Sequence, residues 1–506
     1  MSLRYPLLLI GTLAVASFVN AAEGLLTLGL TDEATSQPVI SHIKIERTDL
    51  SRGKRALPVR VRGMVPLGKG GVLDREMDLA LAPGAYQFII ERGPEYRILT
   101  GNFSLDATSE DQHSVDLTRI IDLYERGWVS GDAHAVPSKH DVPLQMASVD
   151  LHVLAMEPPL PDRPIPGRER DDPVLWDPAW VRTDIVRFDD LMFYGVDDST
   201  REKLSKASTG YERLAIVAPN DEIKVALLNP LAWPVPVWIA TGQVDAVFIY
   251  GNWLRTDRSV RSMDSPIRRL ENAPGGNQSL GHQAEAVWHH LLNCGVRISP
   301  LAGTGDTDES SVIGYNRMYV AEDMVLSNGM MARPKDESAW WEGAFVGRSV
   351  LTNGPLLRGF INESPPGKVI LGGPGLELFP AADLSTRDEV EYLEILQNGQ
   401  SFYKARLDEF AEAGGVLPNL PADKSGWITM RVLTTHAPHR RYATTAAWYV
   451  DAGESSFSLV QQASLEVLTN WLAEYEKRLL KLPPAKLKAH VAGIQRARKF
   501  WASVGK

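Results

Sequence analysis

The first part of the chain alternates apolar and polar residues with the two-residue period of half-exposed β-strands. The segment "IKIE" (43–46) alternates in this way. The segment "APGAYQFIIER" (82–92) places a Pro-Gly turn before a run that carries Tyr86, Phe88 and Ile90 on one face. No segment with a clear helical period interrupts residues 24–118. We therefore expect a small β-sandwich over residues 22–119.

The pattern changes between residues 120 and 345. The apolar runs "LAIVAP" (214–219) and "VDAVFIY" (244–250) lack clean alternation, as buried strands do. The segment "HQAEAVWHHLLNCG" (282–295) has apolar residues at helical spacing and ends at Gly295, a residue that commonly follows a helix. The proline-rich segment 156–173 is expected to be an exposed loop. Strands that alternate with helices predict an α/β core over 120–345.

A second β-rich region is predicted over residues 346–455. The segment "EVEYLEILQNGQSFYKARL" (389–407) has an Asn-Gly pair between two strand-like runs, which is typical of a β-hairpin. We expect a second β-sandwich here, followed by helices over 456–506 that are interrupted at Pro483-Pro484. The apolar stripe of these helices fits either a membrane surface or packing on the protein body; its residues are Leu479, Leu482, Leu487, Val491 and Ile494.

The N-terminus has the three-part pattern of a secretory signal. Arg4 precedes an apolar run from Leu7 to Val19, and the small residue Ala21 follows it. The run is short for a bilayer span, so we expect cleavage of residues 1–21 and export to the periplasm or the exterior rather than an uncleaved anchor. No later segment is long and apolar enough to cross a membrane. Cys294 is the only cysteine, and we expect it to be buried and inert.

The charge balance excludes one class of partner. The 506 residues include 53 Lys and Arg against 63 Asp and Glu, which gives a formal net charge of −10. A nucleic-acid-binding protein normally presents an excess of positive charge, so we expect no nucleic-acid partner.

Candidate chemistry lies in two Asp-x-His pairs and one acidic turn. Asp132 and His134 form the first pair, and Asp150 and His152 form the second. The turn "AGTGDTDE" (302–309) adds Asp306 and Asp308. A divalent metal needs three or more such ligands that converge from different strand ends.

Four motifs, in order along residues 120–360, carry a resemblance to a family. They are "GWVSGDAHAV" (127–136), "HHLLNCGVRISPLAGTG" (289–305), "GYNRMYV" (314–320) and "WWEGAFVGRSVLTNGPLLR" (340–358). Together they resemble the CehA/McbA-type metallohydrolases, relatives of the PHP phosphoesterases. The resemblance implies a PHP-like α/β barrel flanked by β domains, and a divalent metal that activates water to hydrolyse ester, amide or phosphoester bonds.

The sequence departs from this family's metal-binding pattern at several positions. Asp132 and His134 match the opening motif, but Val136 replaces its second histidine. The segment "VLAMEPP" (153–159) supplies no histidine, and Asn252 and Trp253 stand where another histidine is expected. The late Asp-x-His is absent, although Asp306 or Asp308 could replace it. Valine and tryptophan have no lone pair that binds a metal, and the loss of several ligands lowers metal affinity.

Two functions follow from these observations. In the first, the protein is a metal-dependent hydrolase of a small-molecule substrate, with Asp132, His134, Asp150 and His152 as catalytic residues and Asp132, His134, His152 and Asp306 as metal ligands. In the second, it is a metal-free, catalytically inactive binding or scaffold protein on the same fold. We expect Asp132 and His134 at the C-terminal end of the first central strand, where they face a cleft. If the arrangement of the family persists, His152 and an aspartate of the 302–309 turn reach the same cleft.

Overall fold

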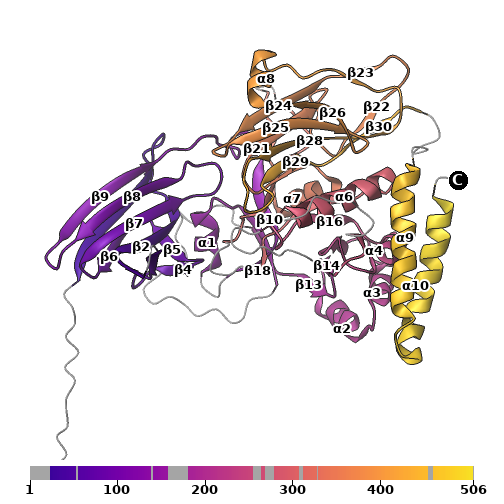
Figure 1. Ribbon diagram of the computed structural model, residues 1–506, viewed down its shortest axis with the longest axis horizontal. Helices are drawn as coiled ribbons and strands as arrows, with labels where there is room; N and C mark the ends of the chain where they lie inside the picture. Colours follow the sequence, from indigo (N-terminus) through magenta and orange to yellow (C-terminus); the bar gives the residue numbers. More distant parts are fainter. Residues whose placement is uncertain are drawn as a thin grey trace, which may run out of the picture.

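A computed structural model describes residues 23–52, 55–137, 141–157, 180–254, 264–267, 278–306, 312–326, 329–453 and 460–504. The predicted signal segment 1–21, most of the predicted loop 156–173, and Asp308 lie outside the described residues. The N-terminal sheets form one end of the molecule, and two long C-terminal helices lie along the other (Figure 1). The second β-rich region lies above the central part in the same view.

The N-terminal region consists of two sheets around one apolar core. The smaller sheet has the order β6 (Glu76–Leu81), β1 (Gly24–Asp32) and β9 (Glu110–Leu117). The larger has the order β4 (Val65–Leu67), β5 (Gly70–Asp74), β2 (Ile40–Arg52), β7 (Gly84–Glu91) and β8 (Leu99–Leu105), with β3 (Arg55–Val59) paired to β2. Leu28 and Leu79 of the first sheet and Ile43 and Ile90 of the second belong to one buried cluster. The prediction of a β-rich region is confirmed.

The central strands form two sheets that the chain connects, and the first of these sheets contains β10 (Val129–Val136). β10 pairs in parallel with β11 (Val153–Met156), and β11 with β12 (Trp180–Arg182), which continues after residues 183–184 into β13 (Ile185–Phe188). The second sheet then runs through β14 (Leu191–Tyr194), β15 (Lys224–Leu227), β16 (Ala246–Tyr250) and β17 (Ser299–Ala302). After residues 303–304, β18 (Gly305–Asp306) pairs in parallel with β10.

Helices accompany these strands. They are α1 (Val142–Ser148), α2 (Asp198–Lys206), α3 (Gly210–Val217), α4 (Val235–Ile239), α6 (Ser279–Asn293) and α7 (Glu337–Val346). The helix expected near 282–295 is α6, in which Ala284, Val287 and Leu291 are fully buried. Gly295 has a φ of 76° and its N–H donates to the carbonyl of Leu292, so it ends this helix as predicted.

The prediction of a strand over 214–219 is wrong, because this run lies largely in α3. Thr209 accepts a hydrogen bond from the N–H of Glu212 through its hydroxyl, and the Glu212 carboxylate accepts one from the N–H of Ser208. This arrangement of a threonine with a glutamate three residues later resembles a capping box and favours a helix start. Leu214 and Val217 are buried on the side of α3 that faces the core, so the apolar run follows a helical period.

The second β-rich region continues a sheet of the core. From β10 the strand order proceeds through β19 (Arg317–Val320), β20 (Ser349–Thr352), β29 (Tyr442–Thr445), β28 (Gly426–Thr434), β25 (Val390–Gln397) and β26 (Gln400–Ala405). Further strands are β21 (Leu356–Ile361), β22 (Val369–Leu371), β23 (Glu377–Leu378), β24 (Pro380–Ser385), β27 (Leu420–Pro421) and β30 (Trp448–Asp451), with the short helix α8 (Leu407–Glu412). Hydrogen-bonded strands thus lie on both sides of the boundary expected at residue 345. The predicted hairpin is β25–β26, in which Asn398 and Gly399 both have positive φ.

The C-terminal helices α9 (Gln462–Leu479) and α10 (Pro484–Ser503) pack on the core. Trp471 donates to the carbonyl of Trp233 at 3.1 Å, and Trp501 donates to the carbonyl of Pro236 at 2.9 Å. Leu479 is buried, and most of the remaining apolar stripe is partly buried against the core, whereas Val491 is 43% exposed. These contacts favour packing on the protein body over a membrane surface.

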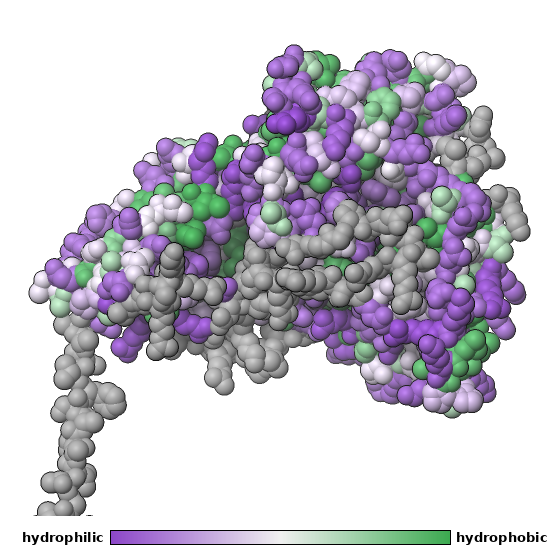
Figure 2. All heavy atoms as spheres, in the orientation of Figure 1, coloured by the Kyte–Doolittle hydropathy of each residue, from purple (hydrophilic) through white to green (hydrophobic). Residues whose placement is uncertain are grey.

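Among the described residues, none of the helices combines the length and hydropathy needed to span a bilayer. Hydrophilic residues cover much of the face shown in Figure 2, with apolar residues in separate patches.

Candidate functional site

Asp132 is a fully buried carboxylate that accepts four hydrogen bonds. Its Oδ1 accepts from the N–H groups of His134 and Thr304, both at 3.1 Å. Its Oδ2 accepts from the Thr304 hydroxyl at 2.5 Å and from the N–H of Gly314 at 2.8 Å. Burial raises the pKa of Asp132 to about 6, although the hydrogen bonds oppose this shift. Asp132 therefore joins β10 to the segments that follow β17 and precede β19.

Asp150 takes part in a buried ion cluster between the N-terminal region and the core. Its carboxylate lies 3.1 Å from the guanidinium of Arg92 and 3.1 Å from that of Arg119. Burial alone would raise the pKa of Asp150, but the arginines lower it below the ordinary value. Both oxygens of Asp150 are thus engaged by the N-terminal side of the molecule.

His152 lies beside Ser130, at the start of β10. The Ser130 hydroxyl is 2.9 Å from Nδ1 of His152, and the ring stacks on Tyr124 with centroids 4.5 Å apart. Burial is the main cause that lowers the pKa of His152 to about 4.

The strand register separates His152 from His134. The backbone N–H of His152 donates to the carbonyl of Ser130, which lies four positions before His134 on the same strand. At about 3.3 Å per residue this places His152 roughly 13 Å along β10 from His134. Bonds from a metal to histidine are about 2 Å long, so these two rings do not reach one ion.

His134, from the first Asp-x-His pair, lines a cavity. This cavity has a volume of about 210 Å³, and Asn252, Trp253 and Asp306 also line it. The His134 side chain is only 2% exposed, and neither of its ring nitrogens has a hydrogen-bond partner. Its Nε2 lies 3.9 Å from Oε1 of Glu157. The ring therefore borders the cavity, with both of its nitrogens buried.

Further charged groups of this site were not predicted from the sequence. Arg187 lies 3.2 Å from the Glu157 carboxylate and 3.9 Å from that of Asp306. Asp190 also lines the cavity, and burial raises its pKa above the ordinary value. Glu157 lies in the proline-rich segment that is predicted to be a loop, and no sequence motif marks Arg187 or Asp190. Glu157, Arg187 and Asp190 are recognised only from their position in the structure, beside β10 and β18.

The donor groups do not fit a shared divalent ion. Both oxygens of Asp132 accept hydrogen bonds from protein donors, and Asp150 and His152 make contacts outside this cavity. Asp306 lies 3.9 Å from the guanidinium of Arg187, whose positive charge disfavours a cation beside it. In the described part of the chain, no three side chains of His, Cys, Asp or Glu gather closely enough to hold a metal.

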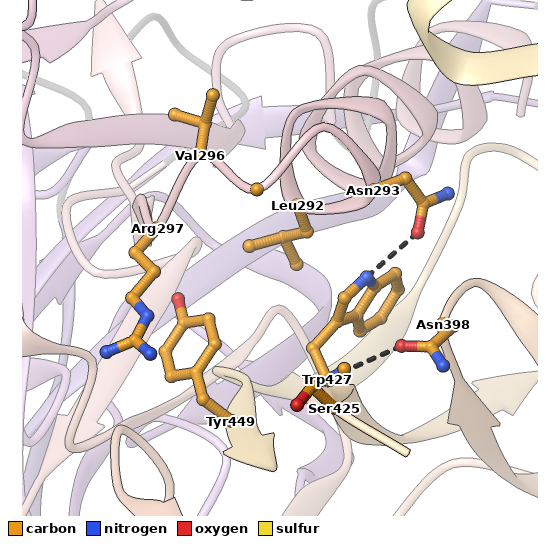
Figure 3. Close-up of a pocket in the computed structure, with 10 residues that line it drawn as sticks. Leu292, Asn293, Val296, Arg297, Asn398, Ser425, Trp427 and Tyr449 are labelled. Carbon is orange, nitrogen blue, oxygen red and sulfur yellow. Dashed lines mark hydrogen bonds between the residues drawn. The ribbon is translucent and has the colours of Figure 1, made fainter. Parts of the chain in front are cut away.

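A second cavity, shown in Figure 3, is too small for an organic ligand. It lies between the end of α6 and the second β-rich region and has a volume of about 20 Å³. Trp427 donates from its indole to Asn293 and from its backbone N–H to Asn398, both visible in Figure 3. Arg297 lies over the ring of Tyr449, 5.0 Å from its centroid. This volume suits about one water molecule.

Comparisons of the chain with protein-family models, with curated proteins and with solved structures return no match.

Proposed function

We propose that this chain is an exported protein that binds a small polar molecule in the His134 cavity, on a PHP-like core that has lost metal-dependent hydrolysis. The observation that carries the proposal is a contrast between His134 and the other three residues of the two Asp-x-His pairs. Asp132, Asp150 and His152 are each engaged in contacts that hold the fold together, whereas the buried His134 ring faces the cavity without a hydrogen-bond partner.

The strand pairing supports the PHP-like part of the proposal. β10, β11 and β12 pair in parallel, β15, β16 and β17 pair in parallel, and β18 pairs in parallel with β10, an arrangement that a PHP-like barrel would share. Three positions at which the CehA/McbA resemblance places metal ligands line one cavity: His134, Asn252 and Asp306. Of these three positions His134 alone holds a histidine, which supports a site that has kept its place and lost its ligands.

The lining of the cavity determines the class of ligand. Asp190, Asp306 and the amide oxygen of Asn252 supply hydrogen-bond acceptors, and Arg187 adds a positive charge to the lining. Trp253 adds an aromatic surface. A molecule rich in hydroxyl or amino groups matches this set, because each donor that it buries would find an acceptor.

A binding assay tests the proposal. Thermal unfolding of the mature protein is measured with glucose, inositol, ethanolamine and spermidine, and at least one compound is expected to raise the melting temperature to a saturating value. His134→Ala should remove this effect, and His113→Ala, a change on an exposed strand, should not. Failure of all four compounds would contradict the proposed ligand class.

Metal content decides between this proposal and the hydrolase. Protein purified without chelator is analysed for transition metals and assayed with p-nitrophenyl esters and phosphates. The proposal expects substoichiometric metal and no hydrolysis. A stoichiometric metal that His134→Ala removes together with hydrolysis would support the enzyme instead.

A further inference from the structure

A third cavity lies where the N-terminal region, the core and the second β-rich region meet. It has a volume of about 150 Å³ and is separate from the His134 cavity. Glu91 reaches it from the end of β7, Arg317 from β19, and Arg387 and Arg441 from loops of the second β-rich region. Three guanidinium groups thus line one space, and none of them was identified from the sequence.

Arg317 is buried without a carboxylate in direct contact. Its exposed fraction is 2%, and its nitrogens donate to the backbone carbonyls of Gly314, Asp150 and Val149. No described carboxylate lies within 4 Å of it. The nearby Asp150 carboxylate is instead engaged by Arg92 and Arg119. The positive charge of Arg317 therefore acts on the cavity without a matched contact.

The other two arginines have one carboxylate each and spare donors. Arg387 lies 3.1 Å from Glu91, while its Nε has no hydrogen-bond partner. Arg441 lies 3.1 Å from Asp388, but the pair lacks the alignment of a hydrogen bond. Burial, and after it the charge of Arg441, lowers the pKa of Arg387, although Glu91 opposes this shift. The three guanidinium groups carry three positive charges, whereas the carboxylates of Glu91 and Asp388 carry two negative charges. One positive charge is therefore in excess.

We propose that this cavity binds a small oxyanion, namely a phosphate or carboxylate group, between the three regions of the chain. The guanidinium fork matches both kinds of group, and an oxyanion would balance the excess positive charge. A water molecule occupies about 30 Å³ in the liquid, so the cavity has room for one such group. Because the ligand would contact residues from all three regions, its binding stabilises their arrangement.

Titration of the full mature protein with inorganic phosphate, and separately with acetate, tests this proposal. Thermal unfolding and calorimetry are recorded at constant ionic strength, which is kept with sodium chloride. At least one of the two anions should raise the melting temperature to saturation. The anion that binds more tightly identifies the group as phosphate or carboxylate.

Variants with opposite expected effects separate binding from structure. Arg441→Gln should weaken anion binding about tenfold, because a hydrogen bond to a charged group is lost. Glu91→Gln should strengthen it, because the competing carboxylate is removed, and this variant keeps the test decisive if Arg441→Gln does not fold. Arg97→Gln, at an exposed position, should change nothing. The proposal is overturned if neither anion binds to saturation, or if Glu91→Gln leaves the affinity unchanged or lowers it.

Discussion

Thr304 donates twice to Asp132, from its hydroxyl at 2.5 Å and from its backbone N–H at 3.1 Å. The two residues are 172 positions apart in the chain, and both are buried. The aspartate of the family-like opening motif thus holds β10 against the segment between β17 and β18, a contact that maintains structure whether or not a metal binds nearby.

Thr304→Val should lower the free energy of unfolding by about 1–3 kcal/mol. Valine has a shape similar to threonine, but it cannot donate a hydrogen bond to the buried carboxylate of Asp132. Urea unfolding followed by fluorescence measures the change. Thr108→Val is the matched control, since the Thr108 hydroxyl donates to Asp106 at 2.8 Å on the exposed surface. Equal losses in the two variants would contradict the role assigned to Thr304.

Asp150→Asn should cost about 3–5 kcal/mol of stability, because it leaves two arginines without their shared buried carboxylate. We also expect faster proteolysis between the N-terminal region and the core. Asp383→Asn breaks the pair with Arg358, whose aspartate is 64% exposed, and should cost about 1 kcal/mol or less. An equal loss of stability in the two variants would contradict the larger contribution assigned to the buried cluster around Asp150.

The stability contribution of His152 should depend on pH. Its folded pKa is about 4, below the ordinary 6.5, so the unfolded chain binds more protons between these values and acid reduces the stability. The stability advantage of the wild type over His152→Gln should therefore shrink by about 1 kcal/mol between pH 7.5 and 5.5. Denaturation curves at both pH values measure it.

Cys294 should not react with Ellman's reagent in the folded protein. The residue is buried, and burial raises the pKa of its thiol to about 12, so almost no thiolate is present at pH 8. After denaturation in guanidinium, one thiol per chain should react. A rapid reaction of the folded protein would show that the end of α6 opens to solvent.

The mature protein should begin near Ala22 if residues 1–21 are a cleaved secretory signal, as the charged start and apolar run predict. N-terminal sequencing of protein recovered from the native host checks this. Detection of an intact Met1 would instead favour an uncleaved anchor.

Local signals in the sequence predicted local structure well. Asn398-Gly399 forms the turn of the β25–β26 hairpin, and Gly295 ends α6, because positive φ is accessible to these residue types. The helix α3 was missed although Thr209 and Glu212 carry a start signal, because the apolar run after them resembles a buried strand.

The site could be predicted only in part, because side-chain partners far along the chain decide its chemistry. Two Asp-x-His pairs look alike in sequence, yet Asp132 meets Thr304 and Gly314 whereas Asp150 meets Arg92 and Arg119. No local pattern predicts these partners. His134 was identified, but the carboxylate of Glu157 and the guanidinium of Arg187 beside it depend on how β11 and β13 are placed against β10.

The shared sheet that passes from β10 through β19 and β20 to β29 limits how this chain can be divided. A fragment that stops at residue 345 loses β20 and leaves β19 with an unpaired edge, which is a template for aggregation. The complementary fragment would begin with β20 unpaired on its β19 side. The core and the second β-rich region should therefore be expressed together, and a transfer of either one to another protein would have to include the other.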